Sequence, residues 1–188
     1  MRLFVAMDIP AEVRAAIAGV AAKLRSVCAS ARWAHLEGAH LTLKFIGEVP
    51  AEKVEEIKTA LAGVPFPAPF KILFRGIGFF PNERRPQVLW AGIEAGPELR
   101  ALAETVEKSL EPLGIARDPR EFSPHVTLAR FKTADKLAGL RAAIAAAGPL
   151  EFGQCPANEF HLYQSVLKPA AAEYTRLATF VSEGSRSR

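Results

Sequence analysis

Residues Ala39–Phe45 read AHLTLKF, and residues Pro124–Arg130 read PHVTLAR. Both stretches contain a histidine, an apolar residue, a threonine and a leucine in that order, and the two histidines lie 85 positions apart. The chain has only four histidines in 188 residues, so chance seldom produces such a repeat. We interpret the repeat as two strands of one fold that carry the two halves of a split active site.

Alternation along a β-strand sorts each motif into a polar and an apolar face. His40 and Thr42 share one face of the first strand, and the leucines that follow each of them share the other. His125 and Thr127 repeat this arrangement in the second strand. The apolar faces supply the core, which leaves one imidazole and one hydroxyl on the far face of each strand.

This pair of polar faces suits chemistry at a phosphorus centre. Such a reaction needs a base for the attacking oxygen and an acid for the leaving oxygen, and histidine titrates near neutral pH in either role. Threonine hydroxyls donate hydrogen bonds to phosphate oxygens, where charge concentrates. The scheme requires no metal. The remaining histidines, His35 and His161, lack metal-ligand spacing, and we interpret both as structural or solvent-facing.

The rest of the chain predicts an α+β fold, with helices packed against largely antiparallel sheets. A similar order of elements after residue 95 suggests an internal duplication. Hydrophobic spacing and turn residues predict strands at 2–9, 41–49, 70–74, 88–93, 122–131, 150–155, 159–167 and 174–181, and helices at 11–29, 50–63, 97–110 and 134–147.

Composition and charge set wider limits. Nearly half of the residues are hydrophobic, at 49%, as in an ordinary globular protein. The net charge of +4 permits an anionic partner without requiring one. No apolar run is long enough to span a membrane, and the first ten residues are expected to form a strand rather than a signal peptide. Cys28 and Cys155 are interpreted as reduced core thiols, and we expect a cytoplasmic protein.

Five stretches together resemble a known family. They are MRLFVAMDIP (1–10), HLTLKFIGEV (40–49), FPNERRPQVLWAGI (80–93), FSPHVTLARF (122–131) and FHLYQSVLKP (160–169). In this order they resemble the 2H phosphoesterase superfamily, and within it the bacterial and archaeal RNA 2′,3′-cyclic phosphodiesterases, formerly called 2′-5′ RNA ligases. The likeness spans nearly the whole chain.

The resemblance implies one bilobal domain over residues 1–188, with pseudo-twofold symmetry and a central cleft. It implies hydrolysis of a terminal 2′,3′-cyclic phosphate on RNA, tRNA fragments included, to a 2′-phosphate, and ligation through a 2′-5′ linkage in reverse. By analogy His40 is the proton donor to the departing 3′ oxygen and His125 is the base. Thr42 and Thr127 would hold the phosphate. No metal or cofactor is implied, and we expect a monomer that does not bind membranes.

Further contacts are left open by the sequence. A basic residue at Arg130 fits the family, but strict alternation sends its side chain to the face opposite His125. Arg84 and Arg85 lie in an exposed loop beside two phenylalanines, where they could hold an RNA backbone or simply be solvated. Phe4 and Trp33 could stack a base, although burial in the core is the default for both.

Two other functions compete with RNA-end hydrolysis. One is a non-catalytic RNA-end binder that keeps the geometry of the motifs for recognition. The other is a 2H enzyme that acts on a small nucleotide, such as a cyclic ADP-ribose phosphate. Turnover of a nucleoside 2′,3′-cyclic phosphate would distinguish an enzyme from a non-catalytic binder. A broad basic surface around the cleft would favour RNA, and a closed pocket would favour a small nucleotide.

Overall fold

The computed structural model describes residues 1–66, 69–133, 137–168 and 172–182 of the chain. Within them lie nine strands and four α-helices. The strands are β1 (Arg2–Asp8), β2 (Arg32–Trp33), β3 (His40–Glu48), β4 (Phe70–Phe80), β5 (Val88–Ala95), β6 (His125–Arg130), β7 (Glu151–Ala157), β8 (Glu159–Leu167) and β9 (Ala172–Val181). The helices are α1 (Ala11–Val27), α2 (Val54–Ala62), α3 (Pro97–Leu110) and α4 (Ala138–Ala147).

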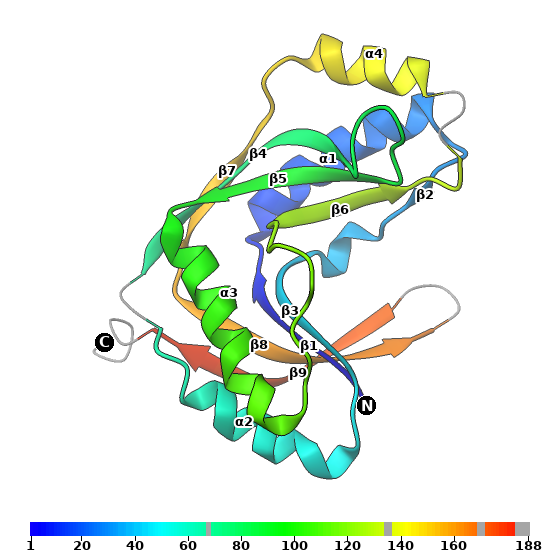
Figure 1. Cartoon of the computed structure of the whole chain (residues 1–188). Coiled ribbons are helices and arrows are strands. Elements are labelled where there is room, and N and C mark those ends of the chain that lie inside the picture. The colour runs from blue at the N-terminus through cyan, green and yellow to red at the C-terminus, as the bar shows by residue number, and fades with distance from the viewer. Residues whose placement is uncertain (67–68, 134–136, 169–171, 183–188) are drawn as a thin grey trace.

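The strands form two antiparallel sheets, which confirms the predicted α+β class. One sheet has the order β3-β1-β8-β9, and the other has the order β2-β6-β5-β4-β7. Without β2 the two orders correspond, and each motif strand lies beside a long central strand, β1 or β5. Each sheet draws strands from both halves of the chain, because β8 and β9 join β1 and β3. The two pseudo-symmetric lobes are therefore interleaved in sequence (Figure 1).

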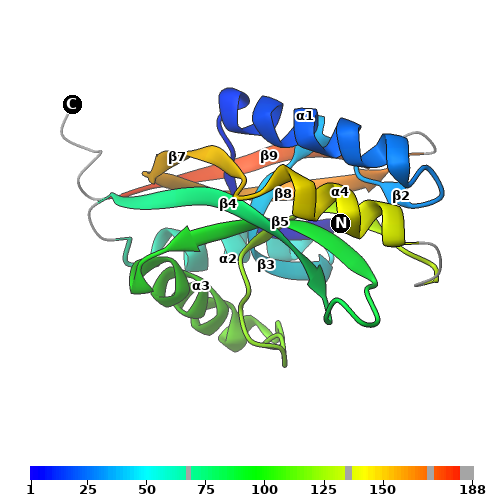
Figure 2. The same cartoon turned by 90° about the horizontal axis from the view of Figure 1, so that it is seen from above.

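Helices cover the outer faces of both sheets. Helices α1 and α4 contact each other, and α1 packs against β7 of the five-stranded sheet. Helices α2 and α3 pair in the same way and contact β9 and β3 of the four-stranded sheet. Figure 2 shows α1 and α4 side by side on one side of β4 and β5. This arrangement buries the apolar faces of the strands and leaves the motif faces away from the helices.

Helix spacing in the sequence predicts most of the buried helix faces correctly. The predicted face of α3, which consists of Leu99, Leu102, Val106 and Leu110, is fully buried. In α1, Val13, Ile17 and Leu24 are buried as expected. The prediction that Val27 is buried on the same face is wrong. Its side chain is 48% exposed, because Val27 is the last residue of the helix.

Several strands differ from the sequence prediction, among them the second motif strand, which begins at His125 rather than at Phe122. The strand predicted at 70–74 continues to Phe80, because Gly76 adopts a positive φ of 75° and forms a bulge that keeps the pairing with β5. Strand β2 was not predicted, since two residues carry no periodicity, and it pairs with β6. Part of the helix predicted at 134–147 lies outside the described residues, and α4 begins at Ala138.

Two further observations concern the thiols and the membrane. Cys28 is buried and Cys155 is half-buried, and both are free thiols. None of the helices within the described ranges is long and apolar enough to cross a membrane.

Candidate active site

The fold brings the two motif strands into contact. β3 and β6 touch each other although they belong to different sheets. Trp33 pairs with Ala129 of β6, and the chain then reaches His40 within seven residues. Seven residues span at most about 25 Å when extended, and the short 3-10 turn at Leu36–Gly38 reduces that reach. A short, structured connection therefore runs from β2, which pairs with the second motif strand, to the first motif strand.

Each motif has the polar and apolar faces that alternation predicts. In β3 the leucines after His40 and Thr42 are buried, while His40 and Thr42 are partly exposed. In β6 His125 and Thr127 are partly exposed, and the residues after them are buried. Neither threonine hydroxyl makes a hydrogen bond within the described part of the chain. Both hydroxyls are thus available to a ligand.

Both histidines are held in the same way by the backbone two residues earlier. Nδ1 of His40 donates to the carbonyl oxygen of Gly38 at 2.9 Å, and Nδ1 of His125 donates to that of Ser123 at 2.7 Å. A carbonyl oxygen only accepts, so each Nδ1 carries the proton and each Nε2 is left for chemistry. A Cβ at Gly38 would lie 2.9 Å from the Tyr174 ring, so a larger residue there would displace that ring.

The two imidazoles differ in the charges around them. The pKa of His40 is lowered, chiefly by burial, and the Gly38 hydrogen bond and the nearby Asp8 carboxylate offset part of that effect. Burial also lowers the pKa of His125, its hydrogen bond to Ser123 raises it, and Arg130 and Arg120 lower it further. A carboxylate therefore favours the charged form of the first histidine, and two guanidinium groups favour the neutral form of the second.

A bulge at the same place in each motif changes the expected alternation. In β3 the residues paired with Ala6 and Val5 are Thr42 and Lys44, so Leu43 is the extra residue. In β6 the residues paired with Trp90 and Leu89 are Thr127 and Ala129, so Leu128 is the extra residue. A bulge shifts every later side chain to the other face.

The bulge brings Arg130 to the face of His125. Strict alternation predicts the opposite face, and that prediction is wrong because Leu128 and Ala129 are both buried and Arg130 is exposed. In the first motif the corresponding residue is Phe45, whose ring lies 6.3 Å from that of Phe4 on the side of His40. One motif thus places a guanidinium, and the other an aromatic ring, beside its histidine.

Aromatic rings surround both histidines, and of these rings the sequence identifies only Phe4 individually as a candidate for stacking a base. Phe4 stacks on His40 with ring centroids 4.5 Å apart, and Tyr174 meets the same imidazole edge-on at 5.2 Å. Phe80 lies edge-on to His125 at 4.9 Å. Phe4 is only 3% exposed, so the default interpretation of Phe4 as a core residue is confirmed. The sequence does not show that these rings lie beside the histidines, since they become neighbours only through strand pairing.

Lys44, inside the first motif, connects β3 to the segment that leads to the second. Its side chain is buried and makes an ion pair with Glu107 of α3 at 2.7 Å. Its ammonium also donates to the carbonyl oxygen of Ala116 at 2.6 Å, and Asp118 N–H donates to Glu107 at 3.4 Å. The segment that precedes His125 is therefore hydrogen-bonded, directly and through Glu107, to the strand that carries His40.

The other two histidines lie outside this arrangement. His161 is fully buried, which shows that the solvent-facing part of its interpretation is wrong. Its Nδ1 lies 3.0 Å from Thr179 Oγ1, while its buried Nε2 has no hydrogen-bond partner and lies 3.5 Å from a Glu159 oxygen. Asp8 accepts hydrogen bonds from Tyr163 at 2.6 Å and from Arg176. His35 is exposed in the connection before β3.

Comparison with known proteins places the chain in a family. The model of the LigT-like phosphoesterases matches residues 7–90 and 93–172, which is most of the chain and includes both motifs. The chain belongs to this family. The resemblance noted from the sequence is thereby confirmed.

Relatives of this LigT-like phosphoesterase carry a common name. The RNA 2′,3′-cyclic phosphodiesterase of Archaeoglobus fulgidus is 36% identical over 96% of this chain and 99% of its own. That of Thermus thermophilus is 37% identical over 100% and 93%. Among solved structures, TT0787 of Thermus thermophilus matches with a TM-score of 0.77 at 35% identity, over 98% and 99% of the two chains. Escherichia coli LigT in complex with 3′-AMP matches with 0.79 at 27%, over 97% and 98%.

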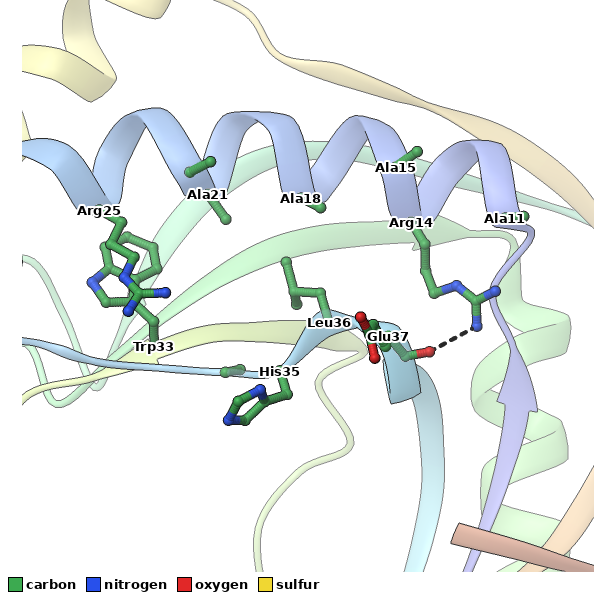
Figure 3. A pocket seen from close by; sticks show the side chains of 12 residues that line it. Ala11, Arg14, Ala15, Ala18, Ala21, Arg25, Trp33, His35, Leu36 and Glu37 are labelled. Carbon is green, nitrogen blue, oxygen red and sulfur yellow. Dashed lines mark hydrogen bonds between the residues drawn. The ribbon is translucent and has the colours of Figure 1, made fainter. Parts of the chain in front are cut away.

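Two hollows in the surface of this phosphoesterase lie away from its motif histidines. One, of about 540 Å³, lies between α1 and residues 33–37, and the other, of about 670 Å³, lies beside Asp8 and Cys155. Figure 3 shows Trp33 and Leu36 directed toward α1 in the first hollow, where Arg14 donates to the carbonyl oxygen of Glu37, while His35 points away. Neither hollow is lined by His40 or His125.

The loop that carries Arg84 and Arg85 is structured and exposed. Asn82 Oδ1 accepts the backbone N–H groups of both arginines at 3.0 and 3.1 Å, and Arg141 donates to the carbonyl oxygen of Glu83 at 2.5 Å. The loop joins β4 to β5, and its end is bonded to β6 through Gln87 and Phe131 at 2.9 Å. It therefore lies at the Arg130 end of the second motif.

Proposed function

We propose that this LigT-like phosphoesterase hydrolyses RNA ends that carry a 2′,3′-cyclic phosphate and leaves a 2′-phosphate. The observation that carries the proposal is the matched pair of imidazoles, each fixed through Nδ1 by a carbonyl two residues earlier on touching strands. Binding alone requires no such pair, whereas acid and base catalysis requires both. The shared name of the relatives supports the choice of an RNA substrate, for which tRNA fragments are candidates. All the groups belong to one chain, so a monomer suffices.

The charges around the histidines support one assignment of their roles. His125, with arginines beside it, remains neutral and takes a proton from water through Nε2. We assign the acid to His40, because the Asp8 carboxylate acts against the lowering of its pKa by burial and so favours its charged form, which gives a proton to the leaving oxygen through Nε2. Neighbouring charges of opposite sign are one way to give two like groups the roles of base and acid. The sequence alone leaves the two roles interchangeable.

The reaction proceeds by in-line displacement at phosphorus. Water attacks the phosphorus atom as His125 accepts its proton, the bond to the 3′ oxygen breaks, and His40 protonates that oxygen. The products are a 2′-phosphate and a 3′-hydroxyl. Thr42, Thr127 and Arg130 hold the non-bridging oxygens, where hydrogen bonds to developing charge accelerate the step. A 5′-hydroxyl in place of water would give a 2′-5′ linkage through the same groups.

Product analysis with a cyclic-phosphate-ended oligonucleotide tests the proposal. The wild-type protein should release a 2′-phosphate, and His40→Ala and His125→Ala should each lower kcat by about 10²–10⁴-fold with an unchanged circular dichroism spectrum. A 3′-phosphate product would contradict the assigned leaving group, and unimpaired variants would favour an RNA-end binder. Activity should persist in EDTA, because the scheme uses only side chains of the protein. Turnover of a cyclic ADP-ribose phosphate but not of RNA would favour the small-nucleotide alternative.

A further inference from the structure

Strand β2 places a second arginine beside Arg130. Arg32 of β2 is directly opposite Arg130 of β6 in the antiparallel register. Residues in such a pair lie on the same face, with Cβ atoms about 5 Å apart, and like charges in these positions destabilise a sheet. Both side chains are exposed. The fold therefore tolerates a repulsive pair at the end of the second motif.

The orientation of the neighbouring residues shows which face this is. Trp33 is opposite Ala129, its indole points toward α1 in Figure 3, and Ala129 is fully buried. Since side chains alternate along a strand, Arg32 points away from α1. The bulge at Leu128 places Arg130 on the same side as His125, whose pKa it lowers. Arg32 thus extends the positive face of the second motif by one strand.

Within the part of the chain that the structure describes, no carboxylate forms an ion pair with either arginine. Five other arginines of that part do form ion pairs with acidic residues. The exposed Arg84 and Arg85 lie in the loop whose end is bonded to Phe131, with Glu83 as the one acidic side chain of that loop. The four-stranded sheet has no counterpart of β2 beside β3 in the described part of the chain, so this charge is confined to one lobe.

We propose that Arg32 binds the internucleotide phosphate next to the reacting phosphate, and that the substrate is accordingly a polynucleotide strand rather than a free nucleotide. The inference rests on the proposed function, in which Arg130 holds the reacting phosphate. A neighbouring phosphate would relieve the repulsion between the two guanidinium groups. Arginine donates two parallel hydrogen bonds to a phosphate, which suits a contact that also positions the strand.

The test compares two substrates of different length. For Arg32→Gln, KM should rise about three- to tenfold for a short oligonucleotide with a 2′,3′-cyclic phosphate end. The KM for a nucleoside 2′,3′-cyclic monophosphate, assayed beside it, should not change. The slope of log kcat/KM against log salt concentration should become shallower by about 0.7 for the oligonucleotide, since one contact to a single strand is lost. Arg32→Lys, which keeps the charge, should recover part of the loss.

The matched control removes one positive charge elsewhere. Lys23 is exposed on α1, and Lys23→Gln should leave the oligonucleotide KM and the salt slope unchanged. Equal losses on both substrates with Arg32→Gln, or no loss on either, would overturn the proposal. Failure of the wild-type protein on both substrates would contradict the proposed function itself, which separates the two failures.

Discussion

At the scale of single residues, the two halves of the site share a scaffold and differ in charge. The Nδ1 hydrogen bonds, the alternation and the bulge are the same in both motifs. The difference lies in Asp8 on one side and Arg130 on the other. A duplicated strand can thus supply an acid and a base without changing the motif, because the neighbours set the protonation state.

The charge near His40 predicts a change on the alkaline side of the pH profile. The acid must be protonated, so activity falls as pH rises through the pKa of His40. Asp8 raises that pKa, and Asp8→Asn removes this effect while keeping the shape of the side chain. The alkaline limb of kcat/KM should therefore move to lower pH, with the acidic limb in place. Movement of the acidic limb instead would show that His40 is the base.

The charge near His125 predicts the complementary change. The base must be neutral, so activity rises with pH through the pKa of His125. Arg130 lowers that pKa, and Arg130→Gln should move the acidic limb to higher pH as well as raise KM. The measurement is the same kcat/KM profile, with Arg25→Gln at an exposed position of α1 as a control for the loss of one arginine. An acidic limb that stays in place would contradict an electrostatic interaction between Arg130 and the catalytic base.

At the scale of elements, the sequence predicts the helices and strands that follow a local hydrophobic periodicity. It does not predict the features that depend on how strands pair. The motif strands, the buried face of α3 and the strand Glu159–Leu167 follow from local patterns and are correct. The bulge at Leu128 has no local signature, because it depends on the register against β5. For this reason Arg130 was expected on the wrong face. Strand β2, and with it Arg32, is likewise visible only through its pairing.

The link between β3 and α3 predicts a loss of stability that an exposed ion pair does not share. Lys44 is 4% exposed and bonded to Glu107 and Ala116, so Lys44→Met leaves the largely buried carboxylate of Glu107 without its cationic partner. The free energy of unfolding should fall by about 3 kcal/mol in urea denaturation. Activity should also fall, because the segment before His125 loses its attachment.

The control is an ion pair of similar length on the surface. Lys58 pairs with Glu55 at 2.7 Å, with 30% and 80% of the side chains exposed. Lys58→Met should cost at most about 0.5 kcal/mol and leave activity unchanged. Similar losses in the two variants would mean that Lys44 contributes only packing of its aliphatic stem.

At the scale of the whole molecule, the pseudo-symmetry is visible in the strand order of the two sheets but not in the order of elements along the chain. The matching orders β3-β1-β8-β9 and β6-β5-β4-β7 confirm two pseudo-symmetric lobes. The sequence rhythm, however, suggests two successive halves, and the sheets are not divided in that way. Periodicity gives the elements, whereas the pairing of β8 with β1 joins residues about 160 positions apart and has no local signal.

This interleaving predicts that the chain folds as one cooperative unit. A cut between Ala95 and Gly96 leaves β1 and β3 without β8, and so exposes the buried Val5 and Leu162. Neither fragment, 1–95 or 96–188, should show a cooperative thermal transition, whereas the intact chain should show a single one. Mixing equal amounts should restore near-UV circular dichroism and activity together, since each sheet and the paired histidines need both pieces. A fragment that melts cooperatively alone would instead show that one half of the chain forms a domain by itself.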